Sequence, residues 1–290
     1  MKRSILVIIS ILMTLQLVLA QSESKSPEAG QAYNEGLTLI RQKKYNEALE
    51  KFKAAVKADN NFPKAHYMLG LTYKSLNNFS AAEKEYKKAI EIDRKFSPAF
   101  IGLGKLQAQQ GKNMEALNTF KAILTYDEKD YKAQYEAGKV LYEMKQYSEA
   151  EKYLAKSVAI QPDYVYALNL LGLTYKELNN FDKAVEAMKN AVKNEKKAAN
   201  KADYQFRLGQ VYLEMRSYKA AEEVFLQALK NTRKNAIKSA ANFYLGETYK
   251  KMGRSAEAVR YYSEASKTSQ WKQAAEYEID LIKNPDKYSN

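Results

Sequence analysis

The feature that most constrains this chain is a glycine that returns at fixed intervals. It recurs every 34 residues at Gly36, Gly70, Gly104, Gly138 and Gly172, and two further steps of 37 residues reach Gly209 and Gly246. In the same register, the decapeptide GLTYKSLNNF at 70–79 returns as GLTYKELNNF at 172–181. Self-similarity at a fixed period of roughly 20 to 50 residues is typical of repeat proteins. We therefore predict an array of about seven similar repeats.

Small and large residues follow each glycine in the same register. An alanine comes twelve residues later, at Ala48, Ala82, Ala116, Ala150, Ala184, Ala221 and Ala258. Four residues further stands a large side chain, at Phe52, Tyr86, Phe120, Leu154, Met188, Phe225 and Tyr262. Each repeat thus carries two stretches of helical periodicity joined by a short polar turn. Glycine and alanine let two helices approach to about 8 to 10 Å, and the large side chain fills the space beside them.

This register resembles the tetratricopeptide repeat (TPR) family, whose signature reads W-x2-L-G-x2-Y, then A-x3-F, then A. The second repeat matches it at Leu69, Gly70, Tyr73, Ala82, Tyr86 and Ala89. The early tryptophan of the signature is replaced in every repeat, and its terminal proline survives only as Pro162. The resemblance covers about residues 29–272 and implies an all-α, right-handed α-solenoid of seven helix-turn-helix repeats. Their predicted bounds are 29–62, 63–96, 97–130, 131–164, 165–201, 202–238 and 239–272.

Two of these repeats are three residues longer than the others. The additional residues lie at about 199–201 and 236–238, in the stretches KNEKKAANKA and KNTRKNAIKSA. Helix propensity is good in both stretches. We therefore expect one added turn on the second helix of the fifth and sixth repeats.

A capping helix is predicted after the last repeat, within the C-terminal segment 273–290. From about Trp271 to Lys283, the residues Ala275, Ile279 and Ile282 recur at helical spacing. Such a helix would cover the last exposed face of the core, and Pro285 would end it.

The N-terminus has the pattern of a secretory signal peptide over residues 1–20. A basic start at Lys2 and Arg3 precedes an apolar stretch that ends in Val-Leu-Ala. This stretch is shorter than the roughly 20 apolar residues of a membrane-spanning helix, so an uncleaved membrane anchor is the second interpretation. Cleavage would leave a polar leader, 21–28, which we expect to be disordered. With the TPR resemblance, this predicts an exported bacterial-type protein, periplasmic or secreted, without a transmembrane segment once the signal is removed.

The charge balance is basic, with 47 lysines and arginines against 34 aspartates and glutamates. The lysines are spread among glutamates along the predicted helices, which is typical of solvated helix faces and of proteins that attract acidic partners. We do not expect nucleic acid to be a partner. The chain has no cysteine, so it forms no disulfide.

No pattern of catalytic or cofactor-binding residues stands out. The single histidine, His66, occupies an early large-residue position of the second repeat, where core packing is expected. No glycine-rich phosphate loop occurs, and zinc would lack its usual cysteine and histidine ligands. We therefore predict that the chain is not an enzyme and binds neither a metal nor a cofactor.

The TPR resemblance implies that the first helix of each repeat lines a concave groove. Its fifth positions hold aromatic residues in five repeats, namely Tyr33, Tyr67, Tyr135, Phe206 and Phe243, and Ile101 and Asn169 in the others. Neighbouring groove positions hold Lys64, Lys74, Lys105, Lys132, Lys139 and Lys176. These aromatics either pack between neighbouring helices or form an aromatic and basic track for a partner. The family's carboxylate clamp of Lys and Asn is not transferred, because Tyr33 and Leu37 stand at those positions.

The expected function is that of a non-enzymatic scaffold or adaptor of the cell envelope. It would bind a segment of a protein or peptide partner, acidic ones included, in the concave groove. The alternative is binding of polysaccharide or peptidoglycan, because aromatic faces also stack on sugars. The sequence identifies neither the partner nor the oligomeric state.

Overall fold

The computed structural model describes residues 24–288. Within this range it contains the α-helices α2 to α16 and a short 3₁₀ helix, η1, and no strand. The predicted signal peptide and residues 21–23 lie outside the described residues. Among the described helices, none combines the length and the apolar character needed to cross a bilayer.

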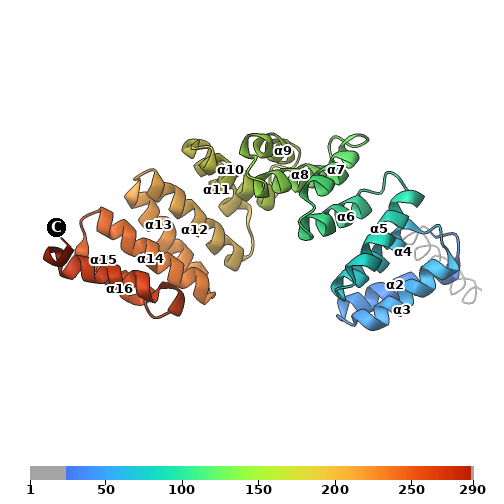
Figure 1. Cartoon of the computed structure of the whole chain (residues 1–290), viewed down its shortest axis with the longest axis horizontal. Coiled ribbons are helices and arrows are strands. Elements are labelled where there is room, and N and C mark those ends of the chain that lie inside the picture. Colours follow the sequence, from blue (N-terminus) through green and yellow to red (C-terminus); the bar gives the residue numbers. More distant parts are fainter. Residues whose placement is uncertain (1–23, 289–290) are drawn as a thin grey trace, which may run out of the picture. The chain divides into compact units, whose positions relative to one another are not determined.

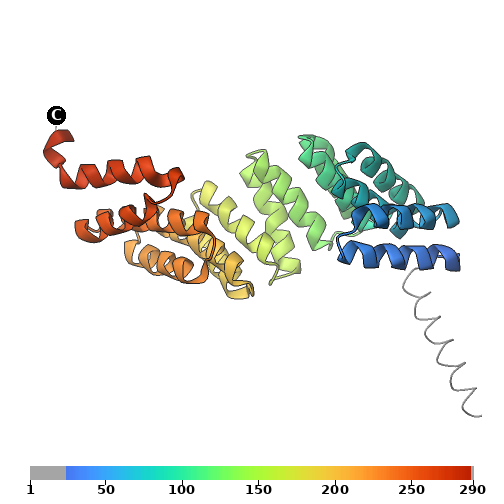
Figure 2. The same ribbon diagram turned by 90° about the horizontal axis from the view of Figure 1, so that it is seen from below.

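The chain divides into two compact halves, with the division after Val140. The N-terminal half comprises residues 24–140 and the C-terminal half residues 141–288; Figures 1 and 2 show the helices from two directions. The helices up to the division are α2 (Pro27–Arg41), α3 (Tyr45–Ala58), α4 (Pro63–Ser75), α5 (Phe79–Ile92), α6 (Ser97–Gln109), α7 (Asn113–Leu124) and α8 (Tyr131–Glu143), the last of which contains the division.

The C-terminal half continues with α9 (Tyr147–Ile160), α10 (Val165–Glu177), α11 (Phe181–Asn194), α12 (Ala198–Glu214), α13 (Tyr218–Asn231), α14 (Asn235–Lys251), α15 (Ser255–Ala265), α16 (Ser269–Lys283) and η1 (Pro285–Tyr288). In both halves the helices pack in consecutive pairs, such as α4 with α5 and α12 with α13. The second helix of a pair also contacts the first helix of the next pair, as α5 contacts α6 and α13 contacts α14. The predicted all-α architecture of stacked helix pairs is confirmed.

The predicted register of small and large residues forms the core. All seven alanines twelve residues after the glycines, and all seven large side chains that follow them, are fully buried. The glycines are required sterically: a Cβ added to Gly104 would lie 2.5 Å from Cε1 of Phe120, and one added to Gly172 would lie 2.5 Å from Cγ of Met188. Close helix approach therefore depends on this register.

The turn between the two helices of a repeat uses the left-handed backbone conformation. Asn77 has a φ of 61° and Asn179 a φ of 57°, and Asn tolerates this region better than most residues. After α4, the N–H of Asn78 donates to the carbonyl of Tyr73 at 2.9 Å, which closes the helix end as in a Schellman motif. The side chain of Asn78 then accepts a hydrogen bond from the N–H of Ala81 and caps α5. In this first copy of the decapeptide the paired asparagines therefore end one helix and begin the next, whereas Asn180 in the second copy makes no side-chain cap hydrogen bond.

The two longer repeats carry their extra turn in a different place from the one predicted. The second helices α11 and α13 each have 14 residues, like most others, whereas the first helices α12 and α14 each have 17. After α11, the Glu195 carboxylate accepts hydrogen bonds from the N–H of Lys197 at 2.8 Å and from the Asn200 side chain at 3.1 Å. These bonds start a new helix at the additional residues, so the predicted extension of the second helices is wrong.

Residues 24–28 also differ from the expected disordered leader. The Ser24 hydroxyl donates to Asp59 at 2.7 Å, and the Ser26 hydroxyl accepts from the N–H of Ala29 at 3.1 Å. Ser26 thereby caps α2, whose first residue is Pro27, a residue favoured at the first helical position. These contacts attach the leader to the first helix pair.

The predicted capping helix is present as α16. It contacts α15 and α14, and Ala275 on it is fully buried. Trp271, Ile279 and Ile282 pack against the same core cluster. The helix ends at Lys283, and Pro285 begins η1.

Candidate functional site

The surface of interest is the face formed by the first helices of successive pairs, here called the first-helix face. In the N-terminal half α4 contacts α6, and in the C-terminal half α14 contacts both α12 and α16. These contacts join α4 to α6 in one half, and α12, α14 and α16 in the other, into a shared surface. All predicted groove residues belong to first helices.

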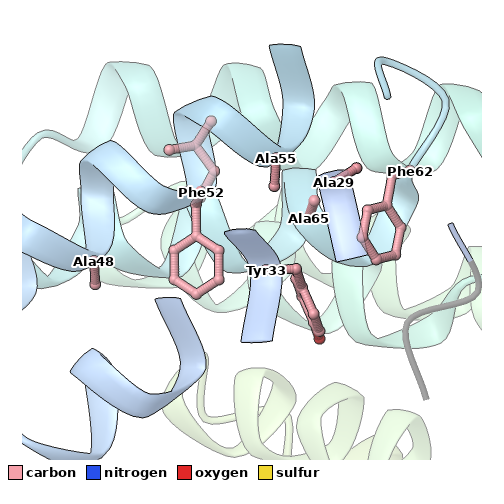
Figure 3. Packing of buried hydrophobic residues seen from close by; sticks show 8 residues of the cluster. Ala29, Tyr33, Ala48, Phe52, Ala55, Phe62 and Ala65 are labelled. Atoms are coloured by element: carbon pink, nitrogen blue, oxygen red, sulfur yellow. The ribbon is translucent and has the colours of Figure 1, made fainter. Parts of the chain in front are cut away.

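The groove aromatics of the N-terminal half pack between helix pairs. Tyr33 is only 9 % exposed, and its ring centroid lies 5.0 Å from that of Phe62 and 5.9 Å from that of Phe52 (Figure 3). Tyr67 is partly buried, with its ring 6.0 Å from Tyr86 and 5.7 Å from Phe96. Burial raises the pKa of the Tyr67 hydroxyl. These rings contribute to the core, and Tyr67 leaves part of its surface on the first-helix face.

The groove aromatics of the C-terminal half belong to a larger aromatic cluster. Phe206 lies 5.5 Å from Tyr244, and Phe243 stacks on Trp271 with a centroid distance of 4.4 Å. Both phenylalanines also contact the large core residue of their own repeat, Phe206 at 5.8 Å from Phe225. Tyr244 and Trp271 also belong to this cluster, and the repeat pattern does not indicate them because neither stands at a fifth position.

The two remaining fifth positions of interest are Tyr135 and Asn169. Tyr135 is partly buried on α8, in the N-terminal half. Asn169, on α10, is partly buried too, and its side-chain oxygen is buried without a hydrogen-bond partner among the described residues. A buried carbonyl oxygen without a donor is costly, so a ligand N–H at this position would be favoured.

Three of the predicted lysines come together in the N-terminal half. They are Lys74 on α4, Lys105 on α6 and Lys139 on α8, and with Glu136 they form what we call the lysine cluster. The Lys105 ammonium lies 2.6 Å from a carboxylate oxygen of Glu136, which is only 5 % exposed. Burial, together with Lys105 and Lys139, lowers the pKa of Lys74 in spite of the opposing effect of Glu136. Burial is the largest of these effects on Lys74.

Two further predicted lysines lie away from this cluster. Lys64 is near the start of α4 and is partly buried. Lys132 is exposed at the start of α8, where its ammonium lies 5.7 Å from the ring centroid of Tyr131. It stands seven residues before Lys139, about 10 Å along the helix axis. Neither lysine is part of the lysine cluster.

Lys176 in the C-terminal half has different surroundings. Its ammonium lies 3.3 Å from Glu214 on α12 and 3.5 Å from Glu177, its neighbour on α10. Burial opposes the charged form of Lys176, but the two carboxylates outweigh it and raise its pKa. Lys250 on α14 likewise pairs with Glu278 on α16. On this half of the chain, these lysines are neutralised by carboxylates of the next first helix.

His66 packs in the core, as expected. It is 4 % exposed, its Nδ1 lies 2.6 Å from Glu85, and its Nε2 lies 3.2 Å from the carbonyl oxygen of Asn60. Residues 24–288 contain no group of three or more potential ligands that could hold a metal ion. His66 also borders a cavity of about 750 Å³ along α5, where charged side chains pair with each other, such as Lys87 with Glu83 at 2.6 Å. We assign no chemistry to this cavity.

Comparisons with known proteins agree with this architecture. Family models described as tetratricopeptide repeat match residues 39–106, 107–173, 169–240 and 240–270. A search among curated proteins found no match.

Several solved structures share the fold. The C-terminal part of a TPR repeat-containing protein from Cytophaga hutchinsonii has a TM-score of 0.65 at 15 % identity, covering 85 % of this chain and 99 % of that one. Pseudomonas aeruginosa PilF has a TM-score of 0.62 at 19 % identity, covering 74 % and 97 %. YrrB, described as a TPR protein with an unusual peptide-binding site, has a TM-score of 0.52 at 20 % identity, covering 64 % and 95 %. These structures share the fold, and the family matches across the repeats show that the chain belongs to the tetratricopeptide repeat family.

Proposed function

We propose that this protein is a non-enzymatic scaffold or adaptor of the cell envelope that binds a segment of a protein or peptide partner on its first-helix face. The observation that carries the proposal is that first helices from successive pairs contact one another on that face, α4 with α6 in one half and α14 with α12 and α16 in the other. A surface of this kind offers a partner several short helices at once, each with its own side chains. TPR proteins bind protein or peptide partners, and this chain has the fold of that family.

The partner of this scaffold is proposed to carry acidic groups. The chain has a formal net charge of +13, and the first-helix face of the N-terminal half has the lysine cluster. Complementary charge speeds encounter and selects among partners more than it adds affinity. The partly buried aromatics of the same face would supply the apolar contact area.

Export is the second element of the proposal. The basic, apolar and small-residue regions of residues 1–20 support recognition as a secretory signal, with Gln21 as the first residue after cleavage. Fractionation of producing cells, with mass spectrometry of the N-terminal peptide, tests it. Recovery of the chain in the cytoplasm with its first 20 residues intact would refute export, and recovery in the membrane fraction with these residues intact would indicate an anchor instead.

Capture of partners from envelope extract tests the scaffold function. We would compare the wild-type protein with Tyr67→Leu and Tyr135→Leu, which retain apolar packing but remove the ring face. Tyr45→Leu, at the start of the second helix α3, is the matched control. We expect partners that are lost with the first two variants and kept with the control. Partner lists that are identical for all four proteins would remove the first-helix face from the proposal, and retention of purified glycan alone would favour a polysaccharide binder.

A further inference from the structure

We propose that the turns leading into α12 and α14 form a basic edge that binds the surface of an anionic membrane. The basic edge is defined by two pairs of neighbouring residues, Lys196 with Lys197 before α12 and Arg233 with Lys234 before α14. It lies at helix ends of the C-terminal half and is distinct from the first-helix face. The inference therefore goes beyond the proposed partner binding and is tested separately from it.

The backbone of each turn leaves its basic pair in solvent. Before α12 the Glu195 carboxylate accepts a hydrogen bond from the N–H of Lys197 at 2.8 Å, and before α14 the Thr232 hydroxyl accepts one from the N–H of Lys234 at 3.1 Å. Glu195 is 7 % exposed and Thr232 is 9 % exposed, whereas the four basic residues of the edge are all exposed. In each turn the acceptor is buried and the basic side chains that follow it are accessible.

The two turns lie at the same edge of the C-terminal half. The Asn231 side chain, at the end of α13, donates to Gln205 in α12 at 2.9 Å, so the second helix returns to the region where the first one starts. α12 also contacts α14, and packed helices lie about 8 to 10 Å apart. The two basic pairs are therefore separated by roughly one helix spacing.

The first turn carries a surplus of positive charge. Residues 193–201 contain four lysines and one carboxylate, that of Glu195. This carboxylate lies near Lys197 and offsets part of the charge. Asp203, just beyond the turn, lies 3.2 Å from Arg207 and is compensated by it.

The second turn is more strongly basic. Residues 230–238 contain Arg233 and three lysines, and they include no acidic residue. Lys238 interacts with Glu264 on α15, but Glu264 also lies 2.6 Å from the Lys267 ammonium. Because this carboxylate is shared between two lysines, the second turn keeps a positive balance.

A turn of the N-terminal half uses the same backbone arrangement without the surplus of charge. Between α5 and α6, the Asp93 carboxylate accepts a hydrogen bond from the N–H of Lys95 at 2.9 Å, and Arg94 and Lys95 are exposed. The carboxylates of Glu91 and Asp93 match these two positive charges. This turn is therefore a control for the basic edge, with the same hydrogen bond and the same pair of basic residues.

An aromatic residue beside the first basic pair favours a membrane as the partner. Tyr166, at the start of α10, is 50 % exposed. Burial raises the pKa of Tyr204, and Glu195 and Tyr166 raise it further, so both of these residues lie near Tyr204. Tyrosine together with lysine or arginine is typical of the membrane–water interface, and clustered basic residues are attracted to anionic headgroups.

Single-stranded nucleic acid fits this edge less well. Proteins that hold single strands stack successive bases on several aromatic rings. Within residues 161–166, 193–201 and 230–238, the one large aromatic side chain that is exposed is that of Tyr166. A plane of headgroups requires no such series of rings and can meet both basic pairs at once.

The test is cosedimentation of the full chain with vesicles. One set contains equal parts of phosphatidylglycerol and phosphatidylcholine, and the other contains phosphatidylcholine alone. Insertion of the apolar residues 1–20 would occur with both sets, so the difference between them measures the effect of lipid charge. A thymidine dodecamer, added as a competitor and titrated directly by anisotropy, represents nucleic acid.

Three double variants probe the edge, and each removes two positive charges. Lys196→Gln with Lys197→Gln changes the first turn, and Arg233→Gln with Lys234→Gln changes the second. Arg94→Gln with Lys95→Gln is the matched control in the N-terminal half. Thermal unfolding of each variant verifies that it is folded.

We expect the wild type to prefer the anionic vesicles, with binding that weakens as salt is added. Each variant of the basic edge should weaken this binding by about tenfold, and the control by less than about twofold. Changes at the two buried acceptors should act in opposite directions. Glu195→Gln removes a negative charge and should strengthen binding about threefold, whereas Thr232→Asp adds one and should weaken it about threefold.

Three results would overturn the inference: equal binding to neutral vesicles, an equal loss with the control variant, or tighter binding of the thymidine dodecamer with the same dependence on the basic pairs. The last result would assign the edge to nucleic acid. None of these results affects the scaffold proposal, because partner capture that depends on Tyr67 and Tyr135 is measured without vesicles. Conversely, loss of partner capture would leave the membrane-binding edge in place.

Discussion

The two copies of the decapeptide form the same local structure in different electrostatic surroundings. In both copies the glycine allows close packing, the first asparagine adopts the left-handed conformation, and the lysine stands on the first helix of its pair. The one letter that differs is Ser75 in the first copy and Glu177 in the second. Ser75 hydrogen-bonds the carbonyl of Leu71 and adds no charge, whereas Glu177 lies 3.5 Å from Lys176.

The helices beside the two copies increase this difference. Lys74 faces other lysines on α6 and α8, and its pKa is lowered; Lys176 faces Glu214 on α12, and its pKa is raised. A repeat therefore conserves its packing residues while its surface charges vary. The comparison indicates that the residues repeated in every unit determine the packing of the helices. The residues of neighbouring helices, which differ between units, determine the charge around the repeated lysine.

The largest expected effect concerns the shared packing frame. Ala82→Leu and Ala184→Leu place a larger side chain where both alanines are fully buried, and overpacking of this kind costs about 1 to 3 kcal/mol. The cost should be higher at Ala82, because its neighbour Tyr86 is a rigid ring, whereas Met188 beside Ala184 can adapt. Urea unfolding of the two variants measures this. Unchanged stability in both would contradict the role of the alanines.

A second pair of variants compares the hydrogen bonding of two tyrosine hydroxyl groups at equivalent core positions. Tyr86 and Tyr262 both stand where three other repeats have phenylalanine, and both are fully buried. The Tyr86 hydroxyl has no hydrogen-bond partner among the described residues, whereas that of Tyr262 donates to Glu247. We therefore expect Tyr86→Phe to stabilise the protein by about 1 kcal/mol and Tyr262→Phe to destabilise it by a similar amount.

Calorimetric melting of the two tyrosine variants provides the measurement. Burial raises the pKa of both hydroxyls, so neither ionises near neutral pH, and the difference between them is one of hydrogen bonding. Shifts of the melting temperature in the same direction would show that the hydroxyl of Tyr86 has a partner or that Glu247 contributes little.

The packing of this molecule could be predicted from its sequence because it depends on local spacing. Gly, Ala and a large residue at fixed intervals predict which side chains meet, and residues such as Ala184 and Met188 are buried accordingly. The extra turns were misplaced because helix propensity is good on both sides of the junction. Side chains at the junctions accept hydrogen bonds just before the new helices: Glu195 accepts from the N–H of Lys197 before α12, and the Thr232 hydroxyl accepts from the N–H of Lys234 before α14.

The candidate site was harder to predict because it depends on contacts between helices. The positions of Lys74 and Lys105 on the groove side followed from the family pattern, but their charge environment did not. Glu136 and Glu214 occupy positions that the pattern does not assign to the groove, yet they determine whether a lysine is paired. The sequence alone does not decide whether Tyr33 binds a partner or packs in the core, and the distance of 5.0 Å between its ring and that of Phe62 supports packing.

A third experiment would convert the second copy toward the first. The double substitution Glu177→Ser and Glu214→Gln removes the two carboxylates that face Lys176. Burial then acts on this lysine without these two carboxylates, so its pKa should fall below its value in the wild type. NMR titration of the Lys176 ammonium in the wild type and the double variant measures the fall. An unchanged pKa would mean that neutralisation of Lys176 by these carboxylates is not what separates the two copies.

The smallest expected effect is the pH dependence of stability, and it has opposite signs for the two lysines. At Lys74 the folded pKa is lowered by burial, Lys105 and Lys139 against Glu136. Between this lowered value and the ordinary lysine value near 10.4, the unfolded chain binds more protons, so the contribution of Lys74 to stability rises with pH. At Lys176 the folded pKa is raised by Glu214 and Glu177 against burial. Its contribution is present below the ordinary value and is lost as pH rises through the raised one.

Urea unfolding of the wild type, Lys74→Gln and Lys176→Gln from about pH 8 to about pH 11 tests these signs. The stability of Lys74→Gln relative to the wild type should decrease as the pH rises, because the variant lacks the contribution of Lys74 that increases with pH. The stability of Lys176→Gln relative to the wild type should increase as the pH rises, because the variant lacks the contribution of Lys176 that decreases with pH. Taking the difference from the wild type cancels the tyrosines and other lysines that titrate in the same range. If both variants changed the slope in the same direction, the two lysines would not be in opposite electrostatic surroundings, and the contrast between the two copies of the decapeptide would have to be abandoned.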